Sequence, residues 1–423
     1  MWYNIYMTKQ QSRKKQSNFI LFFGISFTFV VLFGLFGIFS YLWVFAEEKQ
    51  AYQHFQPSME KIPISDKQVQ EIIEHNSKYK DVLQDVEYMA EYNVYAKEAI
   101  DEDKITITFA GDILFDPNYM VMATLLQNGG DINNAISADL LSEMRNADIM
   151  MLNNEFPYSD RGEPTEGKQF TFRAQPSAVS YLDDMGVDLA SLANNHAYDY
   201  GETAFLDTLD TLKEAGIPYV GAGADEEEAM QPVYYIINNV KIAFLSATQI
   251  ERLDNPDTKG ASGNTPGVFR CWNGEKLLRK VREAKEQSDF VIVYVHWGTE
   301  NEESTDWAQD KQAPELVEAG ADLIIGDHPH ILQKIDVIND TPVIYSLGNF
   351  WFNSKTLDTG MVKVTLTQDG LESFQFIPCL QSGCRTSLLY GEEKERVLSV
   401  MRNMSDHVTI DADGYVTKKV VDT

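Results

Sequence analysis

Residues 290–300 read FVIVYVHWGTE, an apolar run that ends at His296 and passes into a polar segment containing Glu300. The run before the histidine consists entirely of β-branched and aromatic residues, which is typical of a strand buried on both faces. In α/β proteins, ligands bind beyond the carboxyl ends of such strands. This stretch therefore predicts an α/β fold and places a histidine where the site of such a fold is expected.

The same arrangement recurs at four other places in the chain. Short apolar runs end in Gly111-Asp112, Asn153-Asn154-Glu155, Asn194-Asn195-His196 and Gly326-Asp327-His328-Pro329-His330. Helical stretches alternate with these runs, and pairs such as Asn339-Asp340 are typical of hairpin turns, so we expect an α/β sandwich with some antiparallel pairing. The expected strands span residues 105–110, 149–152, 189–193, 219–220, 234–237, 241–247, 290–296, 323–325, 335–338, 343–347, 361–367 and 373–378, and the expected helices span residues 139–146, 176–185, 203–215, 274–287 and 313–319.

Composition excludes several classes of protein. With 35 basic and 64 acidic residues, the 423-residue chain carries a net charge of −29, which argues against binding to the phosphate backbone of nucleic acids. Its three cysteines are too few for a disulfide scaffold or for a cysteine-built zinc or iron-sulfur site. Cys379 and Cys384 could close a small loop outside the cell or remain free thiols, and geometry decides between these states.

The strongest change in composition lies near the N-terminus. Residues 1–18 contain four basic and no acidic side chains, and residues 19–46 contain no charge at all. A run of 28 uncharged residues exceeds the roughly 20 needed to cross a bilayer and is too long for the core of a signal peptide. We therefore expect a single membrane-spanning helix at 19–46 with a cytoplasmic N-terminus and an extracellular C-terminal region. The alternative is a buried core helix.

Residues 65–93 repeat apolar side chains every three or four positions, which is typical of an amphipathic helix. This helix could form a stalk or pack against the domain that follows. The extracellular part then holds 31 basic and 64 acidic residues, a net charge of −33. The expected organisation is a cytoplasmic tail (1–18), a transmembrane helix (19–46), a helical stalk (47–103), an α/β domain (104–380) and a C-terminal extension (381–423).

Six polar residues at the strand ends form a candidate metal-binding set. Each alone has a structural explanation, since Asp112 could be a turn residue and a single buried histidine is more often hydrogen-bonded than coordinating. Together, their carboxylate, amide and imidazole groups are donors that Mn, Zn, Fe or Mg ions accept. Pro329 favours extended backbone before it, which would point the two flanking histidines to one face. The candidate ligands are Asp112, Glu155, Asn195, His296, His328 and His330.

Seven segments occur in a defined order along residues 105–378. They are Ala110-Gly111-Asp112, Asn154-Glu155, Phe170-Thr171-Phe172-Arg173, Ala193-Asn194-Asn195-His196, His296-Trp297-Gly298-Thr299-Glu300, Gly326-Asp327-His328-Pro329-His330 and Ser346-Leu347-Gly348-Asn349-Phe350. This series resembles the bacterial capsule-synthesis family called CapA or PgsA, which serves the poly-gamma-glutamate machinery. The expected N-terminal anchor agrees with that resemblance.

That family is in turn similar to the calcineurin-like metallophosphatases, so the resemblance implies a layered α/β/β/α sandwich with two cation sites. The phosphatases usually begin with Asp-x-His, whereas this chain has Asp112-Ile113-Leu114. We therefore expect one firmly bound cation and a second that is weaker or absent. By the resemblance, Asp112 and His330 belong to the first site, Asn195, His296 and His328 to the second, Glu155 bridges both, and His196 is the general acid.

Two functions from different classes remain open. In the first, the extracellular domain is a non-hydrolytic part of a capsule synthesis and export complex, beside membrane-embedded subunits, and grips the anionic polymer through bound metal. In the second, it is a metal-dependent hydrolase of a phosphate ester or of the polymer. Arg173 could clamp an anionic substrate or form a surface ion pair. Glu300 could face the substrate and orient an imidazole.

Overall fold

The computed structural model describes residues 66–250 and 258–419. The expected cytoplasmic tail, the expected transmembrane helix at 19–46 and residues 47–65 of the expected stalk lie outside the described residues. Among the residues that are described, no helix is long and apolar enough to cross a bilayer.

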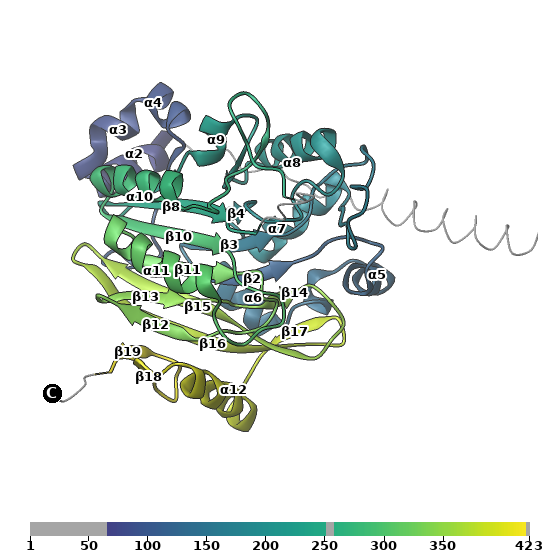
Figure 1. Ribbon diagram of the computed structural model, residues 1–423. Coiled ribbons are helices and arrows are strands. Elements are labelled where there is room, and N and C mark those ends of the chain that lie inside the picture. The colour runs from purple at the N-terminus through teal and green to yellow at the C-terminus, as the bar shows by residue number, and fades with distance from the viewer. Residues whose placement is uncertain (1–65, 251–257, 420–423) are drawn as a thin grey trace, which may run out of the picture. The chain divides into compact units, whose positions relative to one another are not determined.

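Two large mixed sheets form the centre of the fold (Figure 1). The seven-stranded sheet has the order β1 (Val94–Ala96), β7 (Val233–Ile237), β8 (Val240–Thr248), β10 (Phe290–His296), β11 (Leu323–Asp327), β13 (Thr341–Ile344) and β12 (Ile335–Ile338). The eight-stranded sheet has the order β17 (Arg385–Leu388), β16 (Gly370–Ser382), β15 (Leu357–Thr367), β2 (Ile105–Ile113), β3 (Ile149–Asn154), β4 (Leu189–Ser191) and β5 (Tyr219–Val220), with β14 (Asn349–Trp351) also paired to β2.

The centre of each sheet is parallel, which aligns the strand ends. Strands β8, β10, β11 and β13 run parallel in the first sheet, and β2 to β5 run parallel in the second. His296 at the end of β10 lies beside Asp327 at the end of β11, and Asp112 near the end of β2 lies beside Asn153 in β3. The polar residues that end these strands therefore gather at one edge.

Helices cover the outer faces of both sheets, which gives four layers (Figure 1). One apolar cluster fills the space between the sheets. A second cluster packs the eight-stranded sheet against its helices, and a third packs the seven-stranded sheet against its helices. On the seven-stranded sheet lie α2 (Asp66–His75), α3 (Lys80–Gln84), α4 (Val86–Glu91), α10 (Glu275–Gln287) and α11 (Trp307–Ala319). On the eight-stranded sheet lie α5 (Met120–Gln127), α6 (Ala138–Arg145), α7 (Ser180–Met185) and α8 (Gly201–Ala215). The short elements η1 (Ser77–Tyr79), η2 (Ile132–Asn134), η3 (Pro176–Val179), α9 (Glu226–Met230), β6 (Ala222–Gly223) and β9 (Gly267–Val268) complete these layers.

The segment before β2 packs on the domain instead of standing away from it. The single amphipathic helix expected across 65–93 is divided, because Asn76 and Asp85 bond to nearby backbone groups and stop the helices there. The buried Asn76 side chain also accepts from the backbone of Asn239 at 2.9 Å, and Asp289 accepts from Lys78 and from Tyr79, each at 2.6 Å. The sequence allowed either a stalk or a helix packed against the domain, and residues 66–96 pack against the domain.

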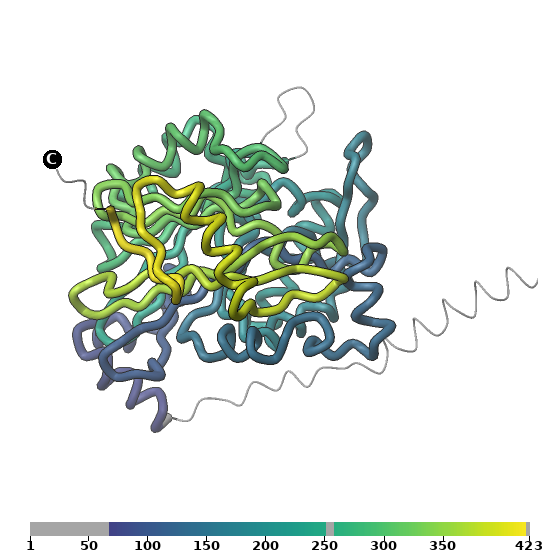
Figure 2. The backbone as a smooth tube through the Cα atoms, turned by 90° about the horizontal axis from the view of Figure 1, so that it is seen from below, coloured from purple at the N-terminus to yellow at the C-terminus, as the bar shows by residue number. Residues whose placement is uncertain are grey.

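The C-terminal segment closes the space between the two sheets. It contains α12 (Gly391–Met404) and a hairpin of β18 (Val408–Ile410) and β19 (Val416–Lys418), and it lies across the sheets in Figure 2. Val397, Leu398, Met401, Val408 and Ile410 join the same apolar cluster as strands from both sheets. This part of the expected C-terminal extension is thus built into the core.

The α/β class expected from the sequence is confirmed. Every strand expected at 105–378 and every helix expected at 139–319 is present, most of them with shifted ends. The cysteines considered for a bridge, Cys379 and Cys384, are both buried free thiols, as is Cys271.

A glycine allows the chain to approach closely next to the strand-end cluster. A Cβ atom at Gly111 would lie 2.0 Å from the carbonyl oxygen of Gly348. The backbone amide of Asp112 donates a hydrogen bond to the same carbonyl oxygen of Gly348 at 3.1 Å. A side chain at position 111 would therefore displace Asp112.

We predict that Gly111→Ala destabilises the protein by about 3 kcal/mol or more, because a backbone atom blocks the added methyl group. Thermal denaturation of the metal-free protein measures this loss. Gly383→Asn is the control, because Gly383 has nothing near its absent Cβ and a φ of 57°, which asparagine tolerates. Equal midpoints for Gly111→Ala and the native protein would contradict the prediction.

Candidate metal centre

The six expected ligands lie together at the edge where the carboxyl ends of strands from both sheets meet. The eight-stranded sheet supplies three of them and the seven-stranded sheet supplies the other three. Asp112 lies in β2, Glu155 follows β3, Asn195 follows β4, His296 ends β10, and His328 and His330 follow β11.

One group of donors surrounds the Nε2 atom of His296. Ligand atoms of Glu155, His296 and His328 all lie within 4.8 Å of one another. The Nε2 atom is 2.8 Å from Asn195 Oδ1, 3.1 Å from His328 Nδ1 and 3.4 Å from Glu155 Oε1. All four side chains are buried. Two imidazoles, one carboxylate and one amide oxygen therefore face a common point.

A second group shares Glu155 with the first. Asp112, Glu155 and His330 also offer ligand atoms within 4.8 Å of one another. His330 Nδ1 lies 3.0 Å from Asp112 Oδ2 and 2.9 Å from Asn349 Oδ1. Asn153 donates to the other oxygen of Asp112 at 2.7 Å. The arrangement is two adjacent donor sets with one carboxylate in common.

The two histidines around Pro329 do not lie on the extended backbone that we expected. His328 has a φ of 102° and His330 a φ of 60°, both in the region that favours glycine. Their rings are 5.9 Å apart and belong to different donor sets. Strained backbone of this kind costs about 1–3 kcal/mol per residue and clusters at functional sites.

The surroundings of the buried Glu155 carboxylate show whether these residues fit a cation. Both of its oxygens are buried, and neither has a hydrogen-bond partner. Burial raises the pKa of Glu155 well above its usual range, and the Asp112 and Asp327 carboxylates add to the effect. A buried carboxylate with no donor is costly, and a bound cation is the usual remedy. The residues present therefore fit a divalent cation.

Two of the three imidazoles are in the neutral form that binds metal. Burial lowers the pKa of His296 to about 3, and burial together with neighbouring histidines lowers the pKa of His328 well below its usual value. For His330, burial acts in the same direction, but the hydrogen bond with Asp112 outweighs it and raises the pKa. His296 and His328 are therefore neutral at neutral pH and keep a lone pair for coordination.

His196 lies beside the cluster and is held by a carboxylate. Its Nδ1 atom is 2.7 Å from Asp199 Oδ2, and Asp199 also bonds Lys168 Nζ at 2.5 Å. The ring of Phe172 lies 4.2 Å from the ring of His196. The imidazole is thus fixed in position next to the donor sets.

The two residues expected to face substrate lie outside the donor sets. Arg173 donates to the carbonyl oxygens of Arg161 and Gly162, and its guanidinium lies 4.2 Å from the ring centre of Tyr200. The surface ion pair considered for Arg173 is not among these contacts. Glu300 is exposed, and its charge contributes to the raised pKa of His330.

The structure adds residues to which the sequence analysis assigned no role. Three of them lie within the motifs quoted from the sequence, next to the candidate ligands: Asn153, Asp327 and Asn349. That proximity is a signal that could have predicted their place at the site. Asp327 has one oxygen bonded by Tyr294 and the other without a partner. Lys168 and Asp199 carried no such signal, because their contacts join irregular segments.

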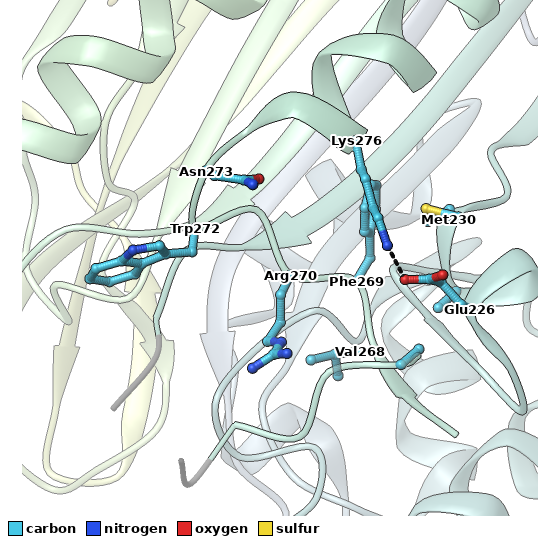
Figure 3. Close-up of a pocket in the computed structure, with 10 residues that line it drawn as sticks. Glu226, Met230, Val268, Phe269, Arg270, Trp272, Asn273 and Lys276 are labelled. Carbon is cyan, nitrogen blue, oxygen red and sulfur yellow. Dashed lines mark hydrogen bonds and ion pairs between the residues drawn. The ribbon is translucent and has the colours of Figure 1, made fainter. Parts of the chain in front are cut away.

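A separate cavity of about 230 Å³ lies beside α9 and the start of α10 (Figure 3). Its charged residues include Lys276 and Glu226, which pair with each other. None of the six expected ligands lines it. This cavity is therefore distinct from the candidate metal centre.

Comparisons with known proteins point to one family. The profile described as "Bacterial capsule synthesis protein PGA_cap" matches residues 106–354. "Capsule biosynthesis protein CapA" of Bacillus anthracis is 30% identical over 308 residues, which cover 70% of this chain and 72% of that protein. "PGA biosynthesis protein CapA" of Bacillus subtilis is 33% identical over 284 residues, which cover 66% and 72%. A solved structure from Thermus thermophilus aligns with 63% of this chain and 97% of its own, at 10% identity and a TM-score of 0.34, which is too distant to inform function.

We predict that Glu155→Gln stabilises the metal-free protein at pH 7.5, because burial and the neighbouring carboxylates raise the pKa of Glu155 and so disfavour its charged form. Because the folded-state pKa of Glu155 is raised, the native protein loses stability as pH rises above the ordinary glutamate range, whereas the variant does not. Thermal midpoints in EDTA at pH 4.5 and 7.5 measure the difference, which should shrink at the lower pH. Glu300→Gln, at an exposed carboxylate, is the control, and an equal effect there would refute the burial argument.

Proposed function

This chain belongs to the bacterial capsule synthesis protein family PGA_cap, and from that membership we propose that it is a membrane-anchored, extracellular component of poly-gamma-glutamate capsule synthesis or export. The names of the two Bacillus relatives, capsule biosynthesis and PGA biosynthesis proteins, support the pathway. The uncharged run at 19–46 supports the anchor. Membrane-embedded synthase or export subunits are the proposed partners.

We further propose that the strand-end cluster holds a divalent cation and that the domain handles the anionic polymer there. The observation that carries this step is the shared Glu155, a buried carboxylate with no donor between two sets of neutral or paired ligands. Glu155, Asn195, His296 and His328 would hold the first cation, and Asp112, Glu155 and His330 a second. The four layers and the cluster at the strand ends also support a sandwich of the calcineurin-like metallophosphatase type.

Charge explains why an acidic protein would need such a centre. The chain carries a net charge of −29 and would repel a polyglutamate chain at long range. A bound cation supplies a local positive charge that a carboxylate or phosphoryl oxygen can approach, and it polarises that oxygen. The buried ligands exclude water around this point, which strengthens the attraction.

We expect the full-length protein to bind Mn²⁺ or Zn²⁺ and to bind fluorescent poly-gamma-glutamate only when the metal is present. Isothermal titration measures the first, and fluorescence anisotropy with and without EDTA measures the second. The double variant His296→Ala/His328→Ala should lose both. The control is His407→Ala, because His407 is a largely exposed histidine between α12 and β18 that pairs with Asp336, which is not a candidate ligand. Polymer binding that persists unchanged in EDTA would overturn the proposed role of the metal.

Hydrolysis is the second candidate function, and the pair of His196 and Asp199 beside the cluster favours it. When both ring nitrogens carry protons, His196 donates Nδ1–H to Asp199 and could give its Nε2 proton to a leaving group. Burial lowers the pKa of His196, so this charged form is favoured at acidic pH. Asp199 fixes the orientation of the ring for that transfer.

If the protein is a hydrolase, His196→Asn should lower turnover of bis(p-nitrophenyl) phosphate or of the polymer by about 10²–10⁴-fold and leave Mn²⁺ affinity unchanged, because His196 is not a ligand. Product release and metal titration on the same samples measure the two effects. Polymer binding without turnover by the native protein would reject hydrolysis and keep the capsule role.

A further inference from the structure

A surface segment inserts one lysine side chain next to the candidate metal centre. Residues 166, 167, 169 and 170 are exposed, whereas the side chain of Lys168 is only 5% exposed. Gly167 has a φ of 77°, which turns the chain so that the residue after it points inward. A lysine is seldom buried unless its ammonium group has partners. The ammonium group of Lys168 must therefore have polar partners inside the protein.

The partners of Lys168 belong to the loop that carries Asn195. Its Nζ atom donates to the backbone carbonyl oxygen of Asn195 and to Asp199 Oδ1, the latter at 2.5 Å. The side chain of Asp199 is fully buried, and its other oxygen accepts from the backbone of Phe172 at 2.7 Å and contacts His196 at the same distance. One ammonium and one carboxylate thus tie together two segments that are far apart in sequence.

Side-chain contacts must fix this loop, because its backbone has little regular structure of its own. Residues 192–200 form no helix or strand. Yet the amide oxygen of Asn195 lies 2.8 Å from His296 Nε2, at the point where the first donor set converges. A change at the backbone carbonyl of Asn195 moves that oxygen directly.

We propose that Lys168 is a positioning residue for the candidate metal centre: by holding the carbonyl of Asn195 and the carboxylate of Asp199, it sets the amide oxygen of Asn195 at the cation site. This inference rests on the proposed metal binding. Lys168 contacts neither the cation site nor a reacting group itself. Outer partners that fix a ligand in this way typically govern metal affinity by about 10–100-fold.

Two physical effects of Lys168 on metal affinity have opposite signs, which makes the inference testable. As a positive charge near a cation, Lys168 repels it, so removal of the charge alone would tighten binding. As a positioning residue, Lys168 lowers the cost of ordering Asn195, so removal would weaken binding. The direction of the change therefore distinguishes the two.

The experiment compares Mn²⁺ affinity of the full-length native protein, Lys168→Met and Lys97→Met by isothermal titration, with thermal midpoints recorded in EDTA. Lys97 is a matched control, because its Nζ atom also donates to a backbone carbonyl, that of Asp148 at 2.6 Å, and to a carboxylate, that of Asp188 at 2.5 Å. Its partners precede β3 and β4, at the opposite ends of these strands from the ligands. We expect Lys168→Met to weaken Mn²⁺ binding about tenfold or more and Lys97→Met to leave it unchanged.

A second variant separates positioning from simple loss of stability. Lys168→Met leaves the buried Asp199 without its ammonium partner, whereas Lys168→Met/Asp199→Asn removes both charges. We expect the thermal midpoint of the double variant to recover toward the native value while Mn²⁺ affinity stays low. Recovery of affinity in the double variant would mean that Lys168 only neutralises Asp199 and would overturn the inference.

Three other outcomes would also test the positioning role of Lys168. Unchanged or tighter Mn²⁺ binding by Lys168→Met would overturn the inference alone and leave the proposed metal centre standing. A native protein that binds no Mn²⁺, Zn²⁺, Fe²⁺ or Mg²⁺ would overturn both. Equal loss of affinity in Lys97→Met would show a general effect of stability and would also count against a positioning role.

Discussion

The buried carboxylate of Glu155 is the constraint around which the site is arranged. A charged group without a donor is unfavourable in a protein interior, and here Asp112 and Asp327 lie close enough to raise its pKa further. The histidines next to it are neutral or paired with Asp112, so they do not supply the missing charge. Protonation of Glu155, which its raised pKa favours, or a bound cation, as we propose, would relieve this penalty.

Two sheets are needed to build this environment, because each supplies half of the ligands. Parallel strands bring Asp112, Glu155 and Asn195 to the end of one sheet and the three histidines to the end of the other. Tyr294 links the sheets just beneath the site by donating to the carbonyl oxygen of Ala110 at 2.9 Å. Pairing between β2 and β3 shifts by a bulge between Phe109 and Asp112, which aims Asp112 toward the other sheet.

The sequence predicted the parts of this structure that depend on local pattern and left out those that depend on distant partners. Apolar runs located the strands, and the polar residues after them located the six candidate ligands that lie together. Helix α11 begins at Trp307 rather than near residue 313, because the capping box of Asp306 and Gln309 starts it and Pro314 is tolerated inside it. Strand β17 is mostly polar and exists through its pairing with β16. The roles of Lys168 and Asp199 were not predictable from the sequence. Their contacts join irregular segments that lie 27 to 34 residues apart. No local sequence pattern indicates that these two side chains are buried.

If the site holds a cation as we propose, the charges around it would favour an anionic ligand that binds through single oxygens. Lys168 is neutralised by Asp199, and Arg173 is engaged with backbone carbonyls and the ring of Tyr200, so neither presents a broad basic surface. The exposed Glu300 adds negative charge at the rim. Under the proposed function, a long polyanion would be repelled along most of its length and attracted only where one carboxylate or phosphoryl group reached a bound cation. Among these described residues around the site, no extended basic groove would retain the rest of the polymer, so one unit at a time would make contact.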